Sequence, residues 1–192
     1  MIKTIKYSKD VDLERELARS QFSYDDVNET VESILKDVKA RGDKALIEYT
    51  EKFDGVKLEN LEVTEEEIQK AFDTIDKDLM EVIQYSHDNI KKFHEKQVRN
   101  DFLIRQENGV VLGQVVNPIE KVGLYVPGGT AAYPSTVLMN AVPAKIAGCK
   151  EIVMVTPPTK DGTILPSLLV AAKISGVDRI FKVGGAQSIA AL

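Results

Sequence analysis

The sequence lacks the features that mark several large classes of protein. It has no tryptophan and a single cysteine, Cys149, so no disulfide can form within the chain. No run approaches the roughly 20 apolar residues of a membrane-spanning helix, and residues 1–7 contain no apolar signal core. We therefore expect a cytoplasmic protein with no membrane partner, in which Cys149 is a small core residue.

A strong excess of charge of one sign is also missing. The formal net charge is -5, which gives no reason to expect nucleic acid as a partner. Of the 192 residues, 43% are hydrophobic and 29% are charged, which is the composition of an ordinary soluble globular protein. Because domains commonly have about 100 to 150 residues, the chain has room for one or two.

Helical periodicity is present in the first half of the chain. A helix that begins near Tyr24 is predicted by apolar residues spaced along one face, namely Val27, Val31, Ile34, Leu35 and Val38. Residues 64–67, Thr-Glu-Glu-Glu, have the form of a capping box and predict the start of another helix. A further helix is indicated by the apolar positions Leu79, Ile83, Ile90 and Phe93.

Two short motifs in this half predict local structure. In Arg41-Gly42-Asp43 we expect the glycine to end one helix and the aspartate to cap the next, rather than a cell-adhesion signal. Asn108-Gly109 lies between the strand-like segments 102–106 and 110–116 and predicts a β-hairpin with a two-residue type I′ turn, in which both turn residues have positive φ. Pro118 ends this ribbon.

After Pro118 the pattern changes to alternating strands and helices. Three apolar runs, 122–126, 151–156 and 179–183, each end at Pro or Gly and precede a helical segment. Such alternation predicts parallel strands with right-handed crossovers, and ligands bind such sheets beyond the carboxyl ends of the strands. The loops at which a site is expected are therefore 127–135, 157–163 and 184–187.

Glycines in two of these loops suggest a ligand site. Residues 127–130, Pro-Gly-Gly-Thr, precede a helix predicted to begin near Ser135 or Thr136, where free amide groups favour an anion. Residues 184–187, Gly-Gly-Ala-Gln, repeat the arrangement. Neither loop has the Gly-x-Gly-x-x-Gly fingerprint or the lysine of a nucleotide P-loop, so the pattern alone fits a tight turn equally well.

Longer blocks of this half resemble the histidinol dehydrogenase family in order and spacing. These blocks are Val122–Gly129, Ser135–Met139, Pro143-Ala144, Ile146–Cys149 and Gly184–Leu192. Weaker similarity in segments 41–43, 53–55 and 89–97 extends the resemblance upstream to about Val31. We interpret the chain as an N-terminal portion of that family's fold.

The resemblance implies roles for individual residues. Tyr125 and Gln187 match residues that contact NAD in the family, and Gly128 and Gly129 follow as backbone neighbours. The residues by themselves also allow Tyr125 to be a partly buried strand aromatic and Gln187 to be a solvated residue of a first helical turn.

Histidinol dehydrogenases oxidise L-histidinol through L-histidinal to L-histidine, the last steps of histidine biosynthesis, and reduce NAD twice. The resemblance implies a homodimer with a catalytic Glu-His pair and a zinc ion held by Gln, His and Asp, with a further His from the partner subunit. These groups lie downstream of the Gln187 block in the family, so we expect no catalytic residue and no metal ligand in this chain. His87 and His94, on one helix face, are interpreted as structural or surface residues.

The expected fold is α/β: a helical N-terminal region with a β-hairpin, followed by an incomplete Rossmann-like parallel βαβαβα unit. We expect an N-terminal arm at 1–21, a mainly helical part at 22–118, and a truncated NAD-binding domain at 119–192. The helix ending at Leu192 has no C-cap, which predicts truncation. Two other functions stay open: a dehydrogenase for another small polar alcohol, and a non-catalytic interaction or regulatory half-domain.

Overall fold

The computed structural model describes residues 8, 25–128 and 131–192. Except for Ser8, the expected arm at 1–21 lies outside this part. The α-helices are α2 (Asp25–Arg41), α3 (Asp43–Asp54), α4 (Glu65–Thr74), α5 (Lys77–His94), α6 (Pro134–Ala147), α7 (Pro166–Ser175) and α8 (Gly185–Ala191). The strands are β1 (Phe102–Arg105), β2 (Val111–Gln114), β3 (Lys121–Tyr125), β4 (Glu151–Thr156) and β5 (Arg179–Lys182), and a short 3₁₀ helix, η1 (Glu95–Gln97), follows α5. The predicted α/β class is confirmed.

Strands β3, β4 and β5 form a parallel sheet in sequence order, as predicted from their alternation with helices. Segment 61–63 lies antiparallel along the outer edge of β5, where the Val63 amide donates to the Ile180 carbonyl at 2.9 Å and the Lys182 amide donates to the Leu61 carbonyl at 2.7 Å. The sequence did not predict this segment. On the other side of the sheet, no strand of the described residues pairs with the outer edge of β3.

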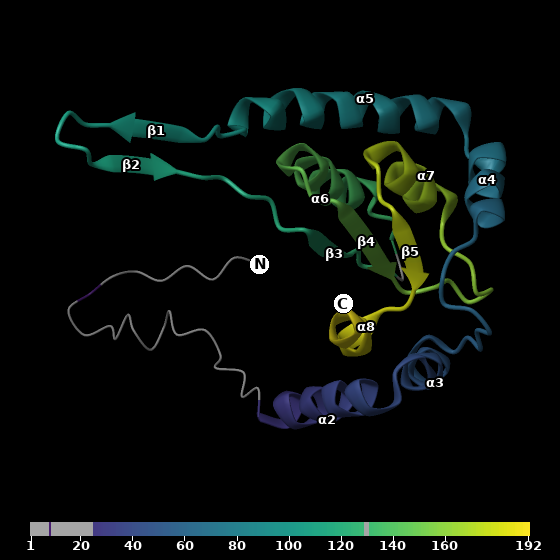
Figure 1. Cartoon of the computed structure of the whole chain (residues 1–192). Coiled ribbons are helices and arrows are strands. Elements are labelled where there is room, and N and C mark those ends of the chain that lie inside the picture. The colour runs from purple at the N-terminus through teal and green to yellow at the C-terminus, as the bar shows by residue number, and fades with distance from the viewer. Residues whose placement is uncertain (1–7, 9–24, 129–130) are drawn as a thin grey trace.

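Helices cover both faces of the sheet (Figure 1). On one face α6 and α7 pack against the sheet, and α5 packs against both of these helices. This core includes Leu124, Ile152, Met154 and Ile180 from the strands. On the opposite face, Val155 and Val183 belong to a second core with residues of α2 and α3, against which α8 packs. Burial of each such side chain stabilises the fold by about 1.5–3 kcal/mol.

The N-terminal helices follow from their apolar faces and caps. Ile34 and Val38 of α2 are buried in the second core, whereas Val27 on the same predicted face is 55% exposed. The capping box of α4 is confirmed, because the Glu67 amide donates to Thr64 Oγ1 at 3.2 Å and the Thr64 amide donates to Glu67 Oε2 at 2.9 Å. None of the helices within 25–128 and 131–192 combines the length and the apolar character that a membrane span requires.

The prediction that Asp43 caps α3 was wrong. Asp43 is the first residue of the helix, and Gly42 precedes it with φ 58° and no capping side chain. A carboxylate in the first turn still interacts favourably with the helix dipole, so the residue type suits either position. Gly42 has the predicted helix-ending conformation, and its amide donates to the Val38 carbonyl at 2.8 Å.

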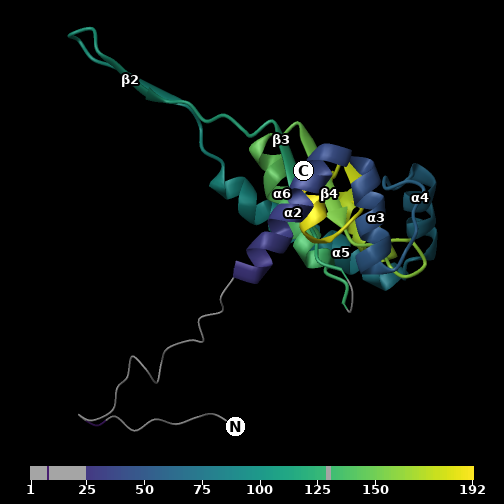
Figure 2. The ribbon, with the colours of Figure 1, turned by 90° about the horizontal axis from the view of Figure 1, so that it is seen from below.

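The hairpin of β1 and β2 is confirmed, but its turn differs from the prediction. Only Gly109 has positive φ, so the two-residue type I′ turn was wrong. The Gly109 amide donates to the Gln106 carbonyl at 3.1 Å, and the Gln106 amide donates to the Val110 carbonyl at 2.9 Å. This pattern is a three-residue loop in which Gly109 supplies the left-handed residue of a bulge. The hairpin extends away from the sheet and its helices (Figures 1 and 2).

Candidate functional site

The loops that follow β3, β4 and β5 meet beyond the carboxyl ends of these strands. Pro157, in the loop after β4, lies between the loop after β3 and the loop after β5. A Cβ atom built on Gly128 would lie 2.6 Å from Pro157 Cγ, and one built on Gly184 would lie 2.7 Å from Pro157 Cβ. Both positions therefore require glycine because the proline ring occupies the space. Gly129, the other predicted glycine of the first loop, lies outside the described residues.

Gln187 lies in the first turn of α8 with its side chain inside the protein. The residue is 1% exposed, and its Oε1 has no hydrogen-bond partner. Gly185 has φ 65°, and a Cβ atom there would lie 2.5 Å from Gln187 Oε1, so the amide folds back over this glycine. The alternative of a solvated Gln187 was therefore wrong. An unpaired buried acceptor costs about 1–3 kcal/mol, which favours a role in binding over one in stability.

Tyr125 is the last residue of β3 and is 39% exposed. Side chains alternate along a strand, so Tyr125 shares its face with Gly123, against which Leu192 at the end of α8 packs. Tyr125 and the helix that carries Gln187 are thus on the same side of the sheet. The structure brings both predicted residues to one edge and one face.

Three further side chains have buried oxygens without a partner, and the sequence analysis missed all of them. They are Thr156 Oγ1, Thr50 Oγ1 and Asp54 Oδ2. Thr156 ends β4, and burial raises the pKa of Asp54, the last residue of α3. The segment after α3 reaches the same edge of the sheet, since a Cβ atom on Gly162 would lie 3.2 Å from Leu58 Cδ2. The signal available for Thr156 was its position as the last residue of a predicted strand, whereas Thr50 and Asp54 lie in a helix and had no such signal.

A sequence model of the histidinol dehydrogenase family matches residues 17–192. The chain belongs to the histidinol dehydrogenase family. It is 56% identical over 167 residues to a histidinol dehydrogenase of Clostridium acetobutylicum, covering 87% of this chain and 39% of that protein. It is 50% identical over 193 residues to a histidinol dehydrogenase of Methanocaldococcus jannaschii, covering 100% of this chain and 45% of that protein.

The fold is also that of the family. The crystal structure of histidinol dehydrogenase from Elizabethkingia anophelis is similar, with a TM-score of 0.84 and 39% sequence identity, over 91% of this chain and 40% of that one. The resemblance found in the sequence is confirmed by both comparisons. The chain spans less than half the length of the relatives described above.

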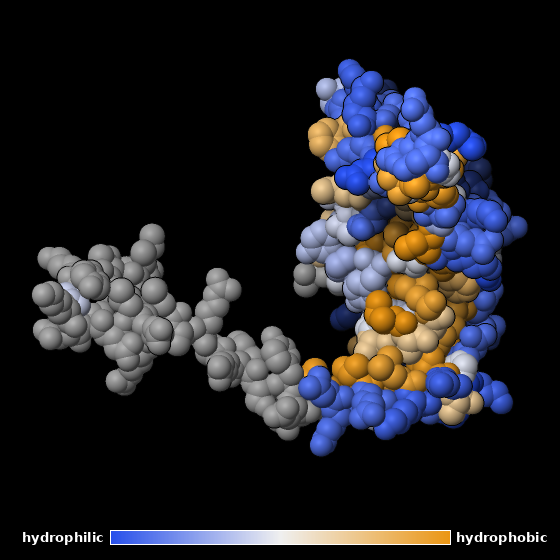
Figure 3. All heavy atoms as spheres, turned by 60° about the vertical axis from the view of Figure 1, so that its left-hand side comes forward, coloured by the Kyte–Doolittle hydropathy of each residue, from blue (hydrophilic) through white to orange (hydrophobic). Residues whose placement is uncertain are grey.

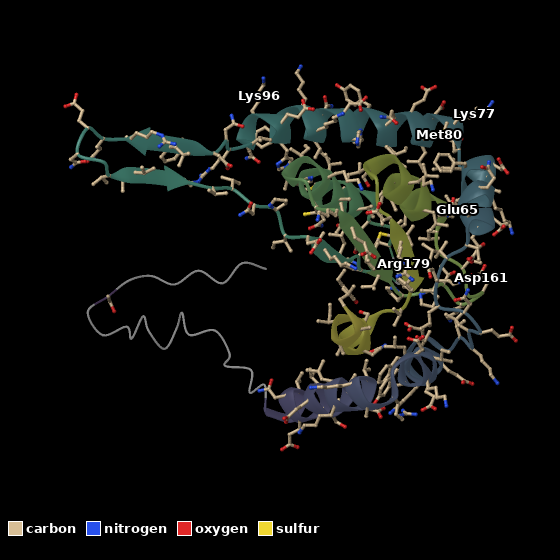
Figure 4. All side chains as sticks on the ribbon, viewed as in Figure 1. Glu65, Lys77, Met80, Lys96, Asp161 and Arg179 are labelled. Atoms are coloured by element: carbon tan, nitrogen blue, oxygen red, sulfur yellow. The ribbon has the colours of Figure 1, made fainter. Side chains whose placement is uncertain are left out.

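Two charged side chains at this edge of the histidinol dehydrogenase fold, Lys182 and Asp161, have partners within the protein. Lys182, at the end of β5, has a side chain only 9% exposed, and its Nζ lies 3.0 Å from Glu67 Oε1. In the loop after β4, hydrogen bonds from the Thr159 and Thr163 hydroxyls lower the pKa of Asp161. Asp161 is labelled in Figure 4. Lys182 therefore presents no uncompensated charge to a ligand.

Ion pairs also fix the segment that precedes α4. The guanidinium of Arg179 at the start of β5 bonds Glu62 at 2.8 and 2.9 Å, and Glu65 at the start of α4 bonds Lys173 of α7 at 3.0 Å (Figure 4). These exposed pairs contribute at most about 1 kcal/mol each. They tie the segment before α4 and the first turn of α4 to the start of β5 and the last turn of α7.

The described residues of this family member include no group of three or more His, Cys, Asp and Glu side chains that could hold a metal ion. His87 Nδ1 lies 2.8 Å from Asp88 Oδ1, and His94 Nδ1 lies 2.6 Å from Gln97 Oε1. The first contact lies within α5, and the second joins the end of α5 to η1. Zinc therefore does not fit the side chains of this part of the chain.

Proposed function

We propose that this chain forms the nucleotide-binding part of an NAD-dependent histidinol dehydrogenase, with Tyr125, Gln187, Gly128 and Gly129 contacting NAD. The observation that carries the proposal is the buried, unpaired amide oxygen of Gln187 at the carboxyl edge of the strands in a member of this family. In such sheets this edge is where nucleotides bind. The glycines contribute through their backbone, since Pro157 fills the space beside Gly128.

NAD, when bound, supplies the acceptor for the hydride that leaves the alcohol carbon. The residues of this chain hold and orient it. The Gln187 amide can accept and donate hydrogen bonds, and the exposed ring of Tyr125 offers an apolar surface with a hydroxyl group. Pro157 lies between Gly128 of the first loop and Gly184 of the third, and its ring fills the space beside both.

We further propose that catalysis requires parts of the family's sequence that this chain does not span. The Glu-His pair, the zinc ligands and the substrate contacts to L-histidinol belong to those parts, and the cytoplasmic homodimer is proposed on the same basis. Residues 119–192 are proposed as the NAD-binding domain and 22–118 as its helical companion. NAD binding to the 192-residue chain alone should then be weak.

An NAD titration followed by NMR tests the binding site. We expect saturable shifts of the amides of Tyr125, Gly128 and Gln187, and an affinity about tenfold lower in Gln187→Leu, because one hydrogen bond is lost. Gln97→Leu, an exposed position on η1, is the matched control and should bind as the unchanged chain does. Shifts confined to other loops, or equal affinity for both variants and the unchanged chain, would contradict the proposed site.

A further inference from the structure

Among the described residues, four side-chain oxygens are buried without a hydrogen-bond partner, and they lie on different faces of the sheet. Thr156 shares a face of β4 with Met154, because side chains alternate along a strand, and that face packs against α6 and α7. Gln187 on α8, and Thr50 and Asp54 on α3, lie on the opposite face. Thr50 is 0% exposed and cannot reach a ligand, whereas Asp54 is partly exposed. Asp54 is therefore the residue that can act beside Gln187.

Asp54 lies at the edge of the sheet where the strands end. Helix α3 starts at the opposite edge, since Asp43 lines a cavity of about 520 Å³ together with Lys121, the first residue of β3. After Asp54, the chain contacts the loop that follows β4, because a Cβ atom on Gly162 would lie 3.2 Å from Leu58 Cδ2. Helix α3 therefore runs in the direction of the strands, and its last turn reaches their carboxyl edge.

The first turn of α8, which carries Gln187, lies at the same edge and on the same face. Helix α8 follows β5 directly and packs against α2 and α3. Ala186, next to Gln187, contacts the core to which Leu46 of α3 belongs. Figure 1 shows α3 and α8 on the side of the sheet opposite α6 and α7. The end of one helix and the start of the other thus bring Asp54 and Gln187 to one edge and one face of the sheet.

The surroundings of Asp54 are unfavourable for a carboxylate. Its buried Oδ2 lacks a donor, and the last turn of a helix carries the negative end of the helix dipole. Burial raises the pKa of Asp54, and no positive side chain of the described residues lowers it. An acidic group that destabilises the fold is expected where a bound ligand supplies the missing donor.

The charge of Asp54 selects the kind of donor. A carboxylate without a neighbouring cation repels the phosphates of a dinucleotide and accepts hydrogen bonds from hydroxyl groups. Its two oxygens match the two adjacent hydroxyls of a ribose. Ile189 and Leu192 of α8 are exposed, and Figure 3 shows apolar surface between hydrophilic borders on one side of the molecule. Apolar surface suits the rings of a nucleotide, so the sugar is the part that requires a polar partner.

The loop after β4 offers no acid for a ribose. In common dinucleotide-binding folds the acid that binds the ribose follows the second strand of the sheet. Here the second strand of the parallel sheet ends at Thr156 and is followed by two prolines. The only acid in that loop, Asp161, already accepts hydrogen bonds from the Thr159 and Thr163 hydroxyls. Asp54, from a helix that precedes the sheet, is the acid left at this edge without a partner.

Resting on the proposed function, we propose that the Asp54 carboxylate binds the adjacent hydroxyls of one ribose of NAD. The ribose then supplies the donor that the buried oxygen lacks, and Gln187 binds a neighbouring part of the same ligand. NAD is in this way held by both halves of the chain, by α3 of the helical half and by the loops of the parallel sheet.

Titrations of the 192-residue chain with NAD, followed by NMR, test the role of Asp54. Asp54→Asn keeps the shape of the side chain and removes its charge. We expect the affinity for NAD to fall at least about tenfold, because a hydroxyl bonds a carboxylate more strongly than an amide. The variant should unfold at an equal or higher temperature, because no partner within the protein is lost. Glu51→Gln, at an exposed position of α3, is the matched control and should leave both properties unchanged.

Two mononucleotides identify the ribose, since adenosine monophosphate and nicotinamide mononucleotide carry one each. Weaker binding of only the first to Asp54→Asn assigns the adenosine ribose, and weaker binding of only the second assigns the nicotinamide ribose.

Two results would overturn the proposal. One is an unchanged affinity of Asp54→Asn for NAD, and the other is a lower unfolding temperature, which would mean that Asp54 has a structural partner. If Gln187→Leu weakens NAD binding while Asp54→Asn does not, the proposed function stands without this contact. If neither variant weakens NAD binding, the proposed function is contradicted as well.

Discussion

Pro157 restricts two positions of the candidate site, Gly128 and Gly184, to glycine. Its ring fills the space beside both Gly128 and Gly184. One side chain of the second loop therefore restricts a position in the first loop and a position in the third to glycine. The sequence indicated that these loops lie at one edge, because the ends of parallel strands meet there. It did not indicate the proline, since the contact joins segments about 30 residues apart and has no local pattern.

Replacing Gly184 by alanine should lower the free energy of unfolding by about 1–3 kcal/mol, because the added methyl overlaps Pro157 in a packed region. Pro157→Ala in the same chain should recover part of the loss by removing ring atoms. Urea denaturation of the single and double variants measures both effects. Pro158→Ala combined with Gly184→Ala is the control and should recover nothing. Equal stability of Gly184→Ala and the unchanged chain would refute the contact.

Gln187 shows what the residue pattern leaves undetermined. Its place in the first turn of a helix was predicted, and the family resemblance singled it out as an NAD contact, which stays a proposal. Its burial was not predicted, because it depends on how α8 packs on the sheet and on α2, through contacts distant in sequence. A polar residue in a first turn is ordinarily solvated, so local reasoning gave the wrong environment.

At the scale of elements, helices and strands were predictable where their signals are local. The capping box of α4 and the three strands of the parallel sheet were confirmed, since each depends on residues adjacent in sequence. The errors were also local. Asp43 suits both a cap and a first turn, and Asn108-Gly109 suits both a two-residue turn and a bulged loop, so composition could not separate the alternatives.

Glu67 connects two elements through two different interactions. Its side chain accepts the Thr64 amide at the start of α4 and pairs with Lys182 at the end of β5. Glu67→Gln keeps an acceptor for the cap but removes the charge. We expect this variant to lose roughly 1–3 kcal/mol of stability, because the Lys182 ammonium is left in a buried position without a counter-charge.

Lys182→Met should cost less, since it removes the buried charge and leaves Glu67 at a position that is 30% exposed. Thermal unfolding of both variants and of the double variant completes a mutant cycle. We expect Lys182→Met to restore part of the stability that Glu67→Gln removes. If the two losses simply add in the double variant, the pair does not contribute as an interaction.

At the scale of the whole molecule, the least predictable feature is how the helical half joins the sheet. Helices α4 and α5 share a core with α6 and α7, and segment 61–63 extends the sheet beyond β5. Apolar periodicity indicates that a helix has a buried face but not what covers it. The expected boundary near residue 118 stays a prediction, although the cores on both faces draw on residues from either side of it.

We propose that this chain supplies the nucleotide-binding part of a histidinol dehydrogenase and not its catalytic groups. The most direct test is NADH formation from L-histidinol with added zinc, measured for the 192-residue chain and for the chimera that continues with the remaining Clostridium acetobutylicum sequence. We expect NADH only from the chimera. A Gln187→Leu chimera should form none at NAD concentrations that leave its weakened site empty. NADH formation by the 192-residue chain alone, or a folded chimera that forms none, would contradict it.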